Sequence, residues 1–383
     1  MKYTPNEVMQ YIREEDVKFV RMAFCDIYGR QRNVAVMASE LPRAFGHGIA
    51  FDASAVSGFD MDVRSDLFLR PNAETLTELP WRPQVGRVAH MFCDIVHPDG
   101  TPFEADTRQL LKRTVRDAAD LGYTFRFGTE MEFYLFRLDE AGEPTTVPFD
   151  TAGYMDVAPE DRGENVRREI CLTLEQLGIL PESSHHESGP GQNEIDFRYA
   201  DPVTAADNAI LFRSVVKAVA SQNGLCADFS PRPLPDHDGN GMHINVSADR
   251  KGETLSPLAL VPGLLCHARE MTRFLNPDAR SYERLGRDKA PLYVSWSEEN
   301  RSPDSTANPY LAFSLIIRAC LDGIARKLPL PEAANLNLFH APAETVRQFA
   351  RLPVSLAEAD EAAKSPFITA HVPAHILDGY GLS

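Results

Sequence analysis

The chain has 383 residues, 43% of them hydrophobic, which is enough for one large domain or for a large and a small domain with separate cores. Its formal net charge of −16 argues against a nucleic-acid partner or a membrane surface, because phosphate groups attract clustered lysine and arginine. The six cysteines show no zinc or redox spacing, and the sequence has neither a signal-peptide core nor an apolar run that could span a bilayer. These features predict a cytoplasmic protein with reduced, buried thiols.

The first hundred residues are predicted to be rich in strands. Residues 17–29 alternate between apolar and polar side chains and end in a turn, and residues 30–38 follow as a second strand. Residues 86–100 form a further alternating run, which Pro-Asp-Gly closes. We therefore expect a small β-dominated domain at residues 1–98 and a larger domain at residues 99–383.

The larger domain is predicted to combine helices with a sheet. Its first helix covers residues 107–121, where apolar residues recur at helical spacing between a capping Asp106 and a terminating Gly122. Further helices are expected at about 163–178, 203–223, 256–275 and 307–327, and strands at about 124–137, 193–199, 226–230, 241–247 and 292–299. Because long segments separate the strands, we expect a mainly antiparallel sheet backed by helices, an α+β fold.

Acidic residues recur where strands are predicted. Glu130 and Glu132 are two apart, so both carboxylates lie on the same face of one strand. Glu187 and Glu194 flank a Gly-Pro-Gly turn that returns the chain on itself. His243 begins a third alternating run, which continues with Asn245 and Ser247. Any one of these patterns alone is as well explained by a solvated strand face or by a histidine in the core.

Together, the four glutamates and the histidine indicate a metal site. Carboxylates that face one cavity repel each other unless a cation neutralises them. Oxygen ligands with one imidazole and no thiolate suit Mg²⁺ or Mn²⁺, and such ions often bridge nucleotide phosphates. The sequence contains no P-loop and no dinucleotide-binding glycine fingerprint, so a phosphate site would be of another type.

Several stretches, taken in order, resemble the glutamine synthetase family, nearest its class I bacterial members. They are "FDASAVSGF", "GTEMEF", "HHESGPGQNEID", "RPLPDHDGNGMHIN", "ERLGRDKAP" and "NPYLAFSLIIRACLDGI". The resemblance implies an N-terminal β-grasp domain and a catalytic domain with a curved antiparallel sheet flanked by helices. It also implies homo-oligomeric stacked rings, expected as a dodecamer, with active sites between neighbouring subunits. Family members use ATP to activate glutamate as γ-glutamyl phosphate, which ammonia then attacks.

The resemblance also assigns roles to residues of this sequence. Two or more Mg²⁺ or Mn²⁺ ions per site are implied, one held by Glu132, Glu187 and Glu194 and another by Glu130, His243 and Glu299. Gly239 and Tyr154 lie at the positions of substrate contacts, and Arg284 at that of the arginine that holds the glutamate carboxylate. Asp52 resembles the aspartate that a neighbouring subunit lends to the ammonium site. Tyr199, Asn245 and Ser247 fall near the nucleotide site, where ATP is the cosubstrate, and Arg301 resembles a phosphate contact.

The sequence departs from the family around residues 288–304. Family members carry an Asn-Arg-Ser run, then a segment rich in basic residues, then Glu-x-Arg-Ser-Pro-Asp; this chain has a single "EENRSPD". Aligning it with the second motif keeps the spacing to Asn308 and supplies Glu299 as a ligand, so we adopt that alignment. Lys289 stands where the family has an acid that takes a proton from ammonium. Ala55 and Asp238 also differ, so the phosphate and ammonium chemistry is altered while the metal ligands are retained.

Three functions therefore remain open. The first is an ATP-dependent ligase that makes glutamine from glutamate and ammonium. The second is a catalytically weak or inactive relative that binds metal, nucleotide or a glutamate-like ligand, which the lost arginines and Lys289 favour. The third is a γ-glutamyl ligase for another amine, since Ala55 and Lys289 change the ammonium pocket.

Overall fold

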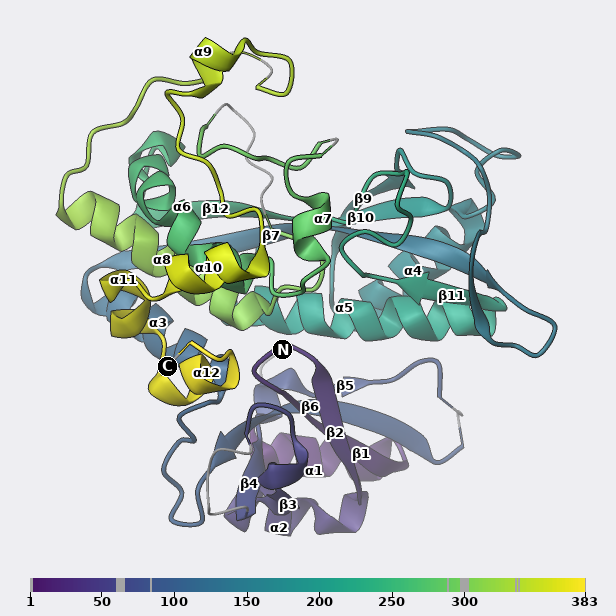
Figure 1. The fold of residues 1–383 in the computed structure, drawn as a ribbon. Coiled ribbons are helices and arrows are strands. Elements are labelled where there is room, and N and C mark those ends of the chain that lie inside the picture. Colours follow the sequence, from purple (N-terminus) through teal and green to yellow (C-terminus); the bar gives the residue numbers. More distant parts are fainter. Residues whose placement is uncertain are drawn as a thin grey trace. The chain divides into compact units, whose positions relative to one another are not determined.

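The structure is a computed structural model, and it describes residues 3–59, 66–82, 85–287, 289–296, 303–334, 336 and 338–382. The chain divides into two compact units (Figure 1). One comprises Met1–Lys112, Glu175–Gly178 and Val372–Ser383, and the other Arg113–Leu174 and Ile179–His371. Among the residues described, no helix combines the length and the apolar character needed to cross a membrane.

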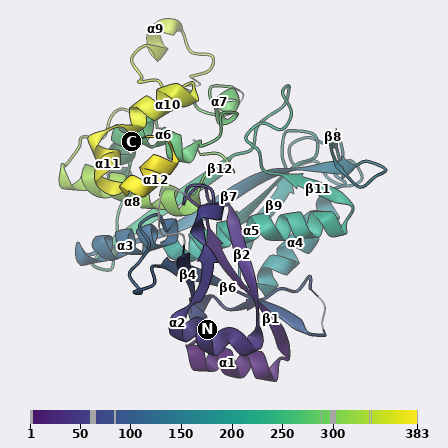
Figure 2. The same ribbon diagram turned by 60° about the horizontal axis from the view of Figure 1, so that its bottom comes forward.

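The first unit is built on a mixed sheet. Its strands are β1 (Val17–Cys25), β2 (Gln31–Met37), β3 (Ile49–Asp52), β4 (Asp66–Pro71), β5 (Thr77–Glu78) and β6 (Arg87–Val96). They follow the order β2-β1-β6-β4-β3, with β5 paired to β6. The pairing of β1 with β6 is parallel, and the other pairs are antiparallel. Figure 2 shows β1, β2 and β6 side by side. The strands expected in the first hundred residues are therefore present.

Helices and the C-terminal residues complete this unit. Helices α1 (Pro5–Glu14) and α2 (Leu41–His47) contact each other and the sheet. The C-terminal α12 (Ala374–Gly379) packs against the turn after β1, because the Tyr28 hydroxyl donates a hydrogen bond of 2.6 Å to the carbonyl of Gly379. Tyr380 returns a hydrogen bond of 3.2 Å to the carbonyl of Ile27. The small domain is thus closed by residues from the far end of the chain.

The second unit contains an antiparallel sheet around one long strand. Its strands are β7 (Tyr123–Leu138), β8 (Pro144–Pro148), β9 (Pro181–His186), β10 (Gln192–Phe197), β11 (Leu225–Asp228), β12 (Met242–Arg250) and β13 (Glu253–Thr254). The order is β13-β12-β7-β10-β9, and β8 and β11 also pair with β7. All of these pairs are antiparallel, as the sequence predicts.

The second unit also contains helices. They are α4 (Glu164–Gln176), α5 (Pro202–Gln222), α6 (Val261–Leu275), α7 (Ser281–Arg284), α8 (Pro309–Ala325), α9 (Ala343–Val346), α10 (Leu356–Ala363) and α11 (Pro366–His371), while α3 (Thr107–Asp120) joins the two units in sequence. Helices α5 and α8 pack against the apolar face of this sheet. Helix α5 lies along β7 in both views (Figures 1 and 2). Phe133 of β7 meets Phe212 of α5 edge to face, and Phe127 stacks on Phe313 of α8 with 4.2 Å between ring centroids. Burial of these rings fixes which face of β7 points away from the helices.

Local sequence signals set the helix ends. Asp106 accepts hydrogen bonds from the backbone N–H groups of Arg108 and Gln109 and so caps α3, and Gly122 adopts a φ of +84° just after its end. The Asp201 side chain likewise accepts from Thr204 at the start of α5. The helices predicted in the larger domain are confirmed to within a few residues at most of their ends.

The strand predicted at 292–299 is the exception. Within the described residues 289–296 only Tyr293 forms a bridge, and its partner is Arg351. Val294 donates to the carbonyl of Ala350, and Leu292 accepts from Leu352. The alternating pattern reflects an extended segment that pairs with a distant loop rather than with the sheet. The prediction that Glu299, Ser297, Ser295 and Tyr293 share a strand face has no support at residues 293–296, and Ser297 and Glu299 lie outside the described residues.

Candidate metal and substrate site

Strand register places the predicted acids on a common face. In the β7–β12 pair His243 lies opposite Glu130, and in the β7–β10 pair Glu194 lies opposite Glu132. Directly opposed residues of an antiparallel pair project from the same face of the sheet. Since β12, β7 and β10 are consecutive in the sheet, four of the predicted metal ligands come from three adjacent strands.

A tight turn adds the fifth predicted ligand, Glu187. The backbone of Glu187 donates to the carbonyl of Gln192, and Gln192 donates to the carbonyl of Gly189, which closes the turn between β9 and β10. The carboxylates of Glu187 and Glu194 are thereby brought together. The turn also buries Glu187, whose carboxylate accepts hydrogen bonds from the backbone and the hydroxyl of Ser188.

Two groups of potential metal ligands result. One consists of Glu130, Glu194 and His243 and the other of His185, Glu187 and Glu194, and within each group the ligand atoms lie within 4.8 Å of one another. Each group offers two carboxylates and one imidazole, and Glu194 belongs to both. This mixture of oxygen and nitrogen donors without thiolate suits Mn²⁺ or Mg²⁺.

Electrostatic repulsion in the site supports a cation there. Burial and the neighbouring carboxylates of Glu132, Asp196, Glu187 and Glu130 raise the pKa of Glu194 to about 9. Burial also raises the pKa of Glu132, although His243 and Arg284 oppose the effect. Because a divalent ion would favour the ionised form of these carboxylates, the donor set fits the metals implied by the sequence.

A third cluster, Asp150, Asp161 and His186, has a structural explanation. All three residues are buried, and the Nε2 of His186 lies 2.9 Å from the carboxylate of Asp150. Asp161 forms an ion pair with Arg167, with 2.5 Å between nitrogen and oxygen. An arginine already supplies the cation, so the cluster is an internal ion-pair network of the turn region.

Glu132 is held by hydrogen bonds from the chain. One of its oxygens accepts from the backbone N–H of Gly241 at 2.9 Å and from Gln192 at 3.0 Å, and the other lies 3.4 Å from Nε2 of His243. Gly241 is required at this point, because a Cβ atom there would lie 2.8 Å from Nε2 of His243. The carboxylate of Glu132 is therefore oriented before any ligand binds.

Buried Arg284 lies against the same carboxylates. It is 4% exposed, and burial lowers its pKa, while Asp304 and Glu132 oppose the shift. A Cβ atom on Gly239 would lie 2.3 Å from the carbonyl of Pro231 and 3.0 Å from the Arg284 side chain, so only glycine fits. Arg284, Gly239 and Glu187 line a small cavity together with Lys289. A guanidinium at this position suits a substrate carboxylate.

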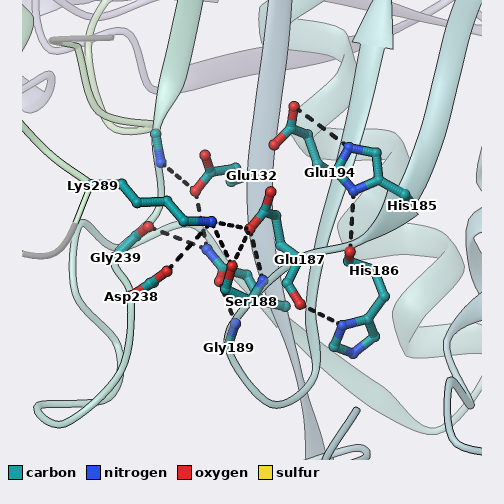
Figure 3. Close-up of polar contacts among 12 residues, drawn as sticks. Glu132, His185, His186, Glu187, Ser188, Gly189, Glu194, Asp238, Gly239 and Lys289 are labelled. Carbon is teal, nitrogen blue, oxygen red and sulfur yellow. Dashed lines mark hydrogen bonds and ion pairs between the residues drawn. The ribbon is translucent and has the colours of Figure 1, made fainter. Parts of the chain in front are cut away.

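Lys289 places an ammonium group among these acids (Figure 3). Its Nζ lies 2.5 Å from the hydroxyl of Ser188, 3.4 Å from Oε2 of Glu187 and 3.8 Å from Asp238. The same nitrogen lies 5.0 Å from the ring centroid of Tyr154, close enough for a cation–π interaction. Lys289 therefore supplies positive charge directly to a predicted metal ligand.

A largely apolar cavity of about 480 Å³ has Glu130 and His243 in its wall. Tyr199 and Asn245, which the sequence predicts near the nucleotide, both line it, together with Trp296 and apolar side chains of α6. The amide of Asn245 donates to Glu130 at 2.7 Å. Ser247 lies further along β12, opposite Arg126, and is not among the residues that line the cavity.

The remaining predicted residues lie elsewhere. Asp52 is at the end of β3 in the first unit, where its side chain accepts hydrogen bonds from the backbone and hydroxyl of Ser54. Arg301 and Glu299 are outside the described residues. Sequence reasoning overlooked His185, although it precedes Glu187 by two positions and thus obeys the same alternation as the acids.

Comparison with known proteins agrees with this architecture. Residues 16–98 match the model of the glutamine synthetase β-grasp domain, and residues 104–303 and 298–381 match that of the glutamine synthetase catalytic domain. The glutamine synthetase of Clostridium saccharobutylicum is 42% identical over 370 residues, covering 88% of this chain and 84% of the relative. That of Methanosarcina mazei is 40% identical over 412 residues, covering 98% and 92%.

Solved structures show the same fold. The structure of a GmaS/ADP complex superposes with a TM-score of 0.88 at 28% identity, covering 97% of this chain and 94% of that one. The glutamine synthetase of Plasmodium falciparum superposes with a TM-score of 0.85 at 20% identity, covering 99% and 95%. A β-grasp domain followed by a sheet that carries acids on one face defines an enzyme of the ligase class. The chain belongs to the glutamine synthetase family, whose members generally use ATP and divalent metal ions.

The comparisons also bear on the shortened region. The two matches to the catalytic-domain model overlap at residues 298–303, so the same six residues correspond to two places in the family. The alignment with the Methanosarcina relative spans more positions than the chain has residues, so part of that relative has no counterpart here. The chain is thus a shortened family member.

Proposed function

We propose that the chain is an ATP-dependent carboxylate–amine ligase that forms glutamine from glutamate and ammonia through a γ-glutamyl phosphate. The observation that carries the proposal is the pair of ligand groups that share Glu194, together with two adjoining cavities, one lined by buried Arg284 and the other largely apolar. This arrangement offers separate places for metal ions, an amino-acid carboxylate and a nucleobase.

Two Mg²⁺ or Mn²⁺ ions complete the proposed site. Glu132, Glu187 and Glu194 would hold the ion nearer glutamate, and Glu130, His243 and Glu299 the other. Bound there, such ions neutralise phosphate charge and polarise the transferred phosphoryl group. The chain's own part is to orient the carboxylates, as Gly241 and Gln192 do for Glu132, and to bind the glutamate carboxylate through Arg284.

The position of residues 303 and 304 supports Glu299 as a ligand and Arg301 as a phosphate contact. Met242 donates to the carbonyl of Pro303 at 3.0 Å, and Gly241 forms an antiparallel bridge with Asp304. The residues directly after the proposed contacts therefore run beside the start of β12, next to His243. This is the neighbourhood that the alignment of "EENRSPD" with the second family motif requires.

Lys289 favours a second candidate function, ligation of an amine other than ammonia. Its ammonium group already lies beside Glu187 and the face of Tyr154, where a small cationic substrate would find its best partners. The same contact supports the alternative of a weak enzyme, because Lys289 neutralises a carboxylate that a metal ion would otherwise neutralise.

We further propose that the protein acts in the cytoplasm as homo-oligomeric rings, with the dodecamer as the expected form. None of the described cysteines forms a disulfide, which suits a reducing compartment, although the expectation of buried thiols is wrong for the exposed Cys266. Asp52 is exposed at the end of β3 and available to the site of a neighbouring subunit. Mass measurement of the native assembly tests the ring, and an Asp52→Asn variant that left the KM for ammonium unchanged would contradict that role for Asp52.

The decisive experiment measures phosphate release from ATP in the presence of glutamate, with ammonium and with a panel of primary amines, in Mg²⁺ and in Mn²⁺ separately. Release that requires both glutamate and an amine establishes the ligase, and the preferred amine separates the two candidate substrates. Binding of ATP and metal without release under any of these conditions would identify a non-catalytic relative.

A further inference from the structure

His185 lies in register with the proposed metal ligands. It is on β9, and in the β9–β10 pair it is directly opposite Glu194, which in turn is opposite Glu132 across the β10–β7 pair. The three side chains thus form a row across adjacent strands. Since directly opposed residues share a face, the imidazole of His185 projects toward the same site as the acids.

The ring of His185 is oriented for binding through Nε2. Its Nδ1 lies 3.1 Å from the carbonyl oxygen of His186, and because a carbonyl only accepts, Nδ1 carries the proton. The other nitrogen, Nε2, is then the one with a free lone pair. The ring edge packs against Tyr154, with 5.4 Å between centroids and 76° between planes, which further fixes its direction. Histidine ligands of metals in proteins generally donate their second ring N–H in this way.

The distance from His185 to Glu194 also fits a bridging ion. Nε2 lies 3.9 Å from Oε1 of Glu194, which is too long for a hydrogen bond. A nitrogen and an oxygen that bind one ion at about 2.1 Å each lie at most about 4.2 Å apart. Figure 3 shows His185 and Glu194 on one side of Glu187 and Lys289 on the other, so the lysine does not block this approach.

We propose that His185 binds, through Nε2, the same divalent ion as Glu187 and Glu194. The inference deepens the metal-binding part of the proposed function and does not depend on turnover. An imidazole ligand favours Mn²⁺ over Mg²⁺ at this position, because Mg²⁺ prefers oxygen. With His243 in the other ligand group, each of the two ions then has one nitrogen ligand.

The test is pulsed electron paramagnetic resonance of the full chain loaded with Mn²⁺, which detects coupling to directly bound imidazole nitrogen. We expect two imidazole couplings in the unmodified protein, one lost in His185→Gln and the other lost in His243→Gln. His47→Gln, on the exposed end of α2, is the matched control and should retain both. Titration calorimetry should show Mn²⁺ affinity at least about tenfold weaker in His185→Gln, with a smaller change for Mg²⁺.

The outcomes separate this inference from the proposed ligase. A His185→Gln protein that keeps both couplings and its Mn²⁺ affinity overturns the assignment, as does the absence of Mn²⁺ binding to the unmodified chain. His185→Asn serves as a second variant, and its thermal unfolding without metal shows whether the fold is retained. Two couplings in a protein without ligase turnover would uphold the role of His185 and reject the proposed function.

Discussion

A buried histidine of the first unit and a buried glutamate of the second have pKa values shifted in opposite directions. In the first unit, His90 of β6 is fully buried, and burial lowers its pKa to about 4. In the second, burial and neighbouring carboxylates raise the pKa of Glu194 to about 9. His90 is buried in a sheet core and touches Gln31, whereas Glu194 lies in a cluster of like charges. A buried, neutral histidine can pack in a core without a bound ion, whereas clustered carboxylates repel each other unless a cation neutralises them.

Glu194→Gln should have the largest effect, because this carboxylate belongs to both ligand groups. We expect loss of high-affinity Mn²⁺ binding and a fall in any ligase rate of at least about 10³-fold, since phosphoryl transfer depends on charge neutralisation. Titration calorimetry and the coupled assay measure these changes. Glu140→Gln, on an exposed turn, is the control and should be unaffected. Unchanged metal binding in Glu194→Gln would show that the acids form no metal site.

Arg284→Lys should be next in effect. It keeps the charge but loses the planar fork, so we expect the KM for glutamate to rise about 100-fold with a smaller change in kcat. Arg280→Lys, at an exposed position in the preceding turn, is the matched control. A fall in kcat with no change in KM would exclude a role for Arg284 in holding the substrate carboxylate.

Lys289→Met should strengthen metal binding. It removes the ammonium group 3.4 Å from Glu187, so the ion no longer competes with an internal cation. We expect Mn²⁺ affinity to rise about tenfold, corresponding to one strong charge-assisted contact of about 1.4 kcal/mol. Lys289→Arg retains the charge and should keep the affinity of the unmodified protein. Weaker binding in Lys289→Met would mean that the lysine supports the site instead.

The pH dependence of stability should have opposite signs for the two groups. For His90 the folded pKa is below the unfolded value of 6.5, so stability is lost as the pH falls from about 6.5 to about 4, by about 3 kcal/mol. For Glu194 the folded pKa is above 4.5, so without metal stability is lost as the pH rises from about 4.5 to about 9.

Chemical denaturation across this pH range measures both slopes. His90→Gln should reduce the acid slope and Glu194→Gln the alkaline one, each leaving the other unchanged. Mn²⁺ should remove only the alkaline slope, because the ion favours the ionised carboxylates. An alkaline slope as steep in Glu194→Gln as in the unmodified protein would show that Glu194 does not contribute to it.

The sequence could predict features that depend on local patterns, but it could not predict contacts between residues far apart in the chain. The sequence predicted four site residues on strands, because alternation with a period of two sets which side chains share a face, whatever strand lies beside them. These residues are Glu130, Glu132, Glu194 and His243. His185, two positions before Glu187, satisfies the same rule, but a single histidine in a strand is as well explained by a place in the core.

The incorrect strand at 292–299 has a different origin. Residues 292–294 pair with residues 350–352, more than fifty positions away, and no local pattern reveals such a partner. The hydrogen bond from Tyr380 to Ile27 in the first unit could not be predicted from local patterns either, since the two residues are 353 positions apart.

The central claim is that a site built from the acids of β7 and β10 and from His243 of β12 activates a glutamate carboxylate with ATP. Trapping with hydroxylamine tests it most directly, because an acyl phosphate formed in the site reacts with this nucleophile whatever amine the enzyme prefers. With ATP, glutamate and Mn²⁺ the account predicts γ-glutamyl hydroxamate from the unmodified protein and none from Glu194→Gln. No hydroxamate from a protein shown to bind ATP and Mn²⁺, or equal amounts from both proteins, would contradict it.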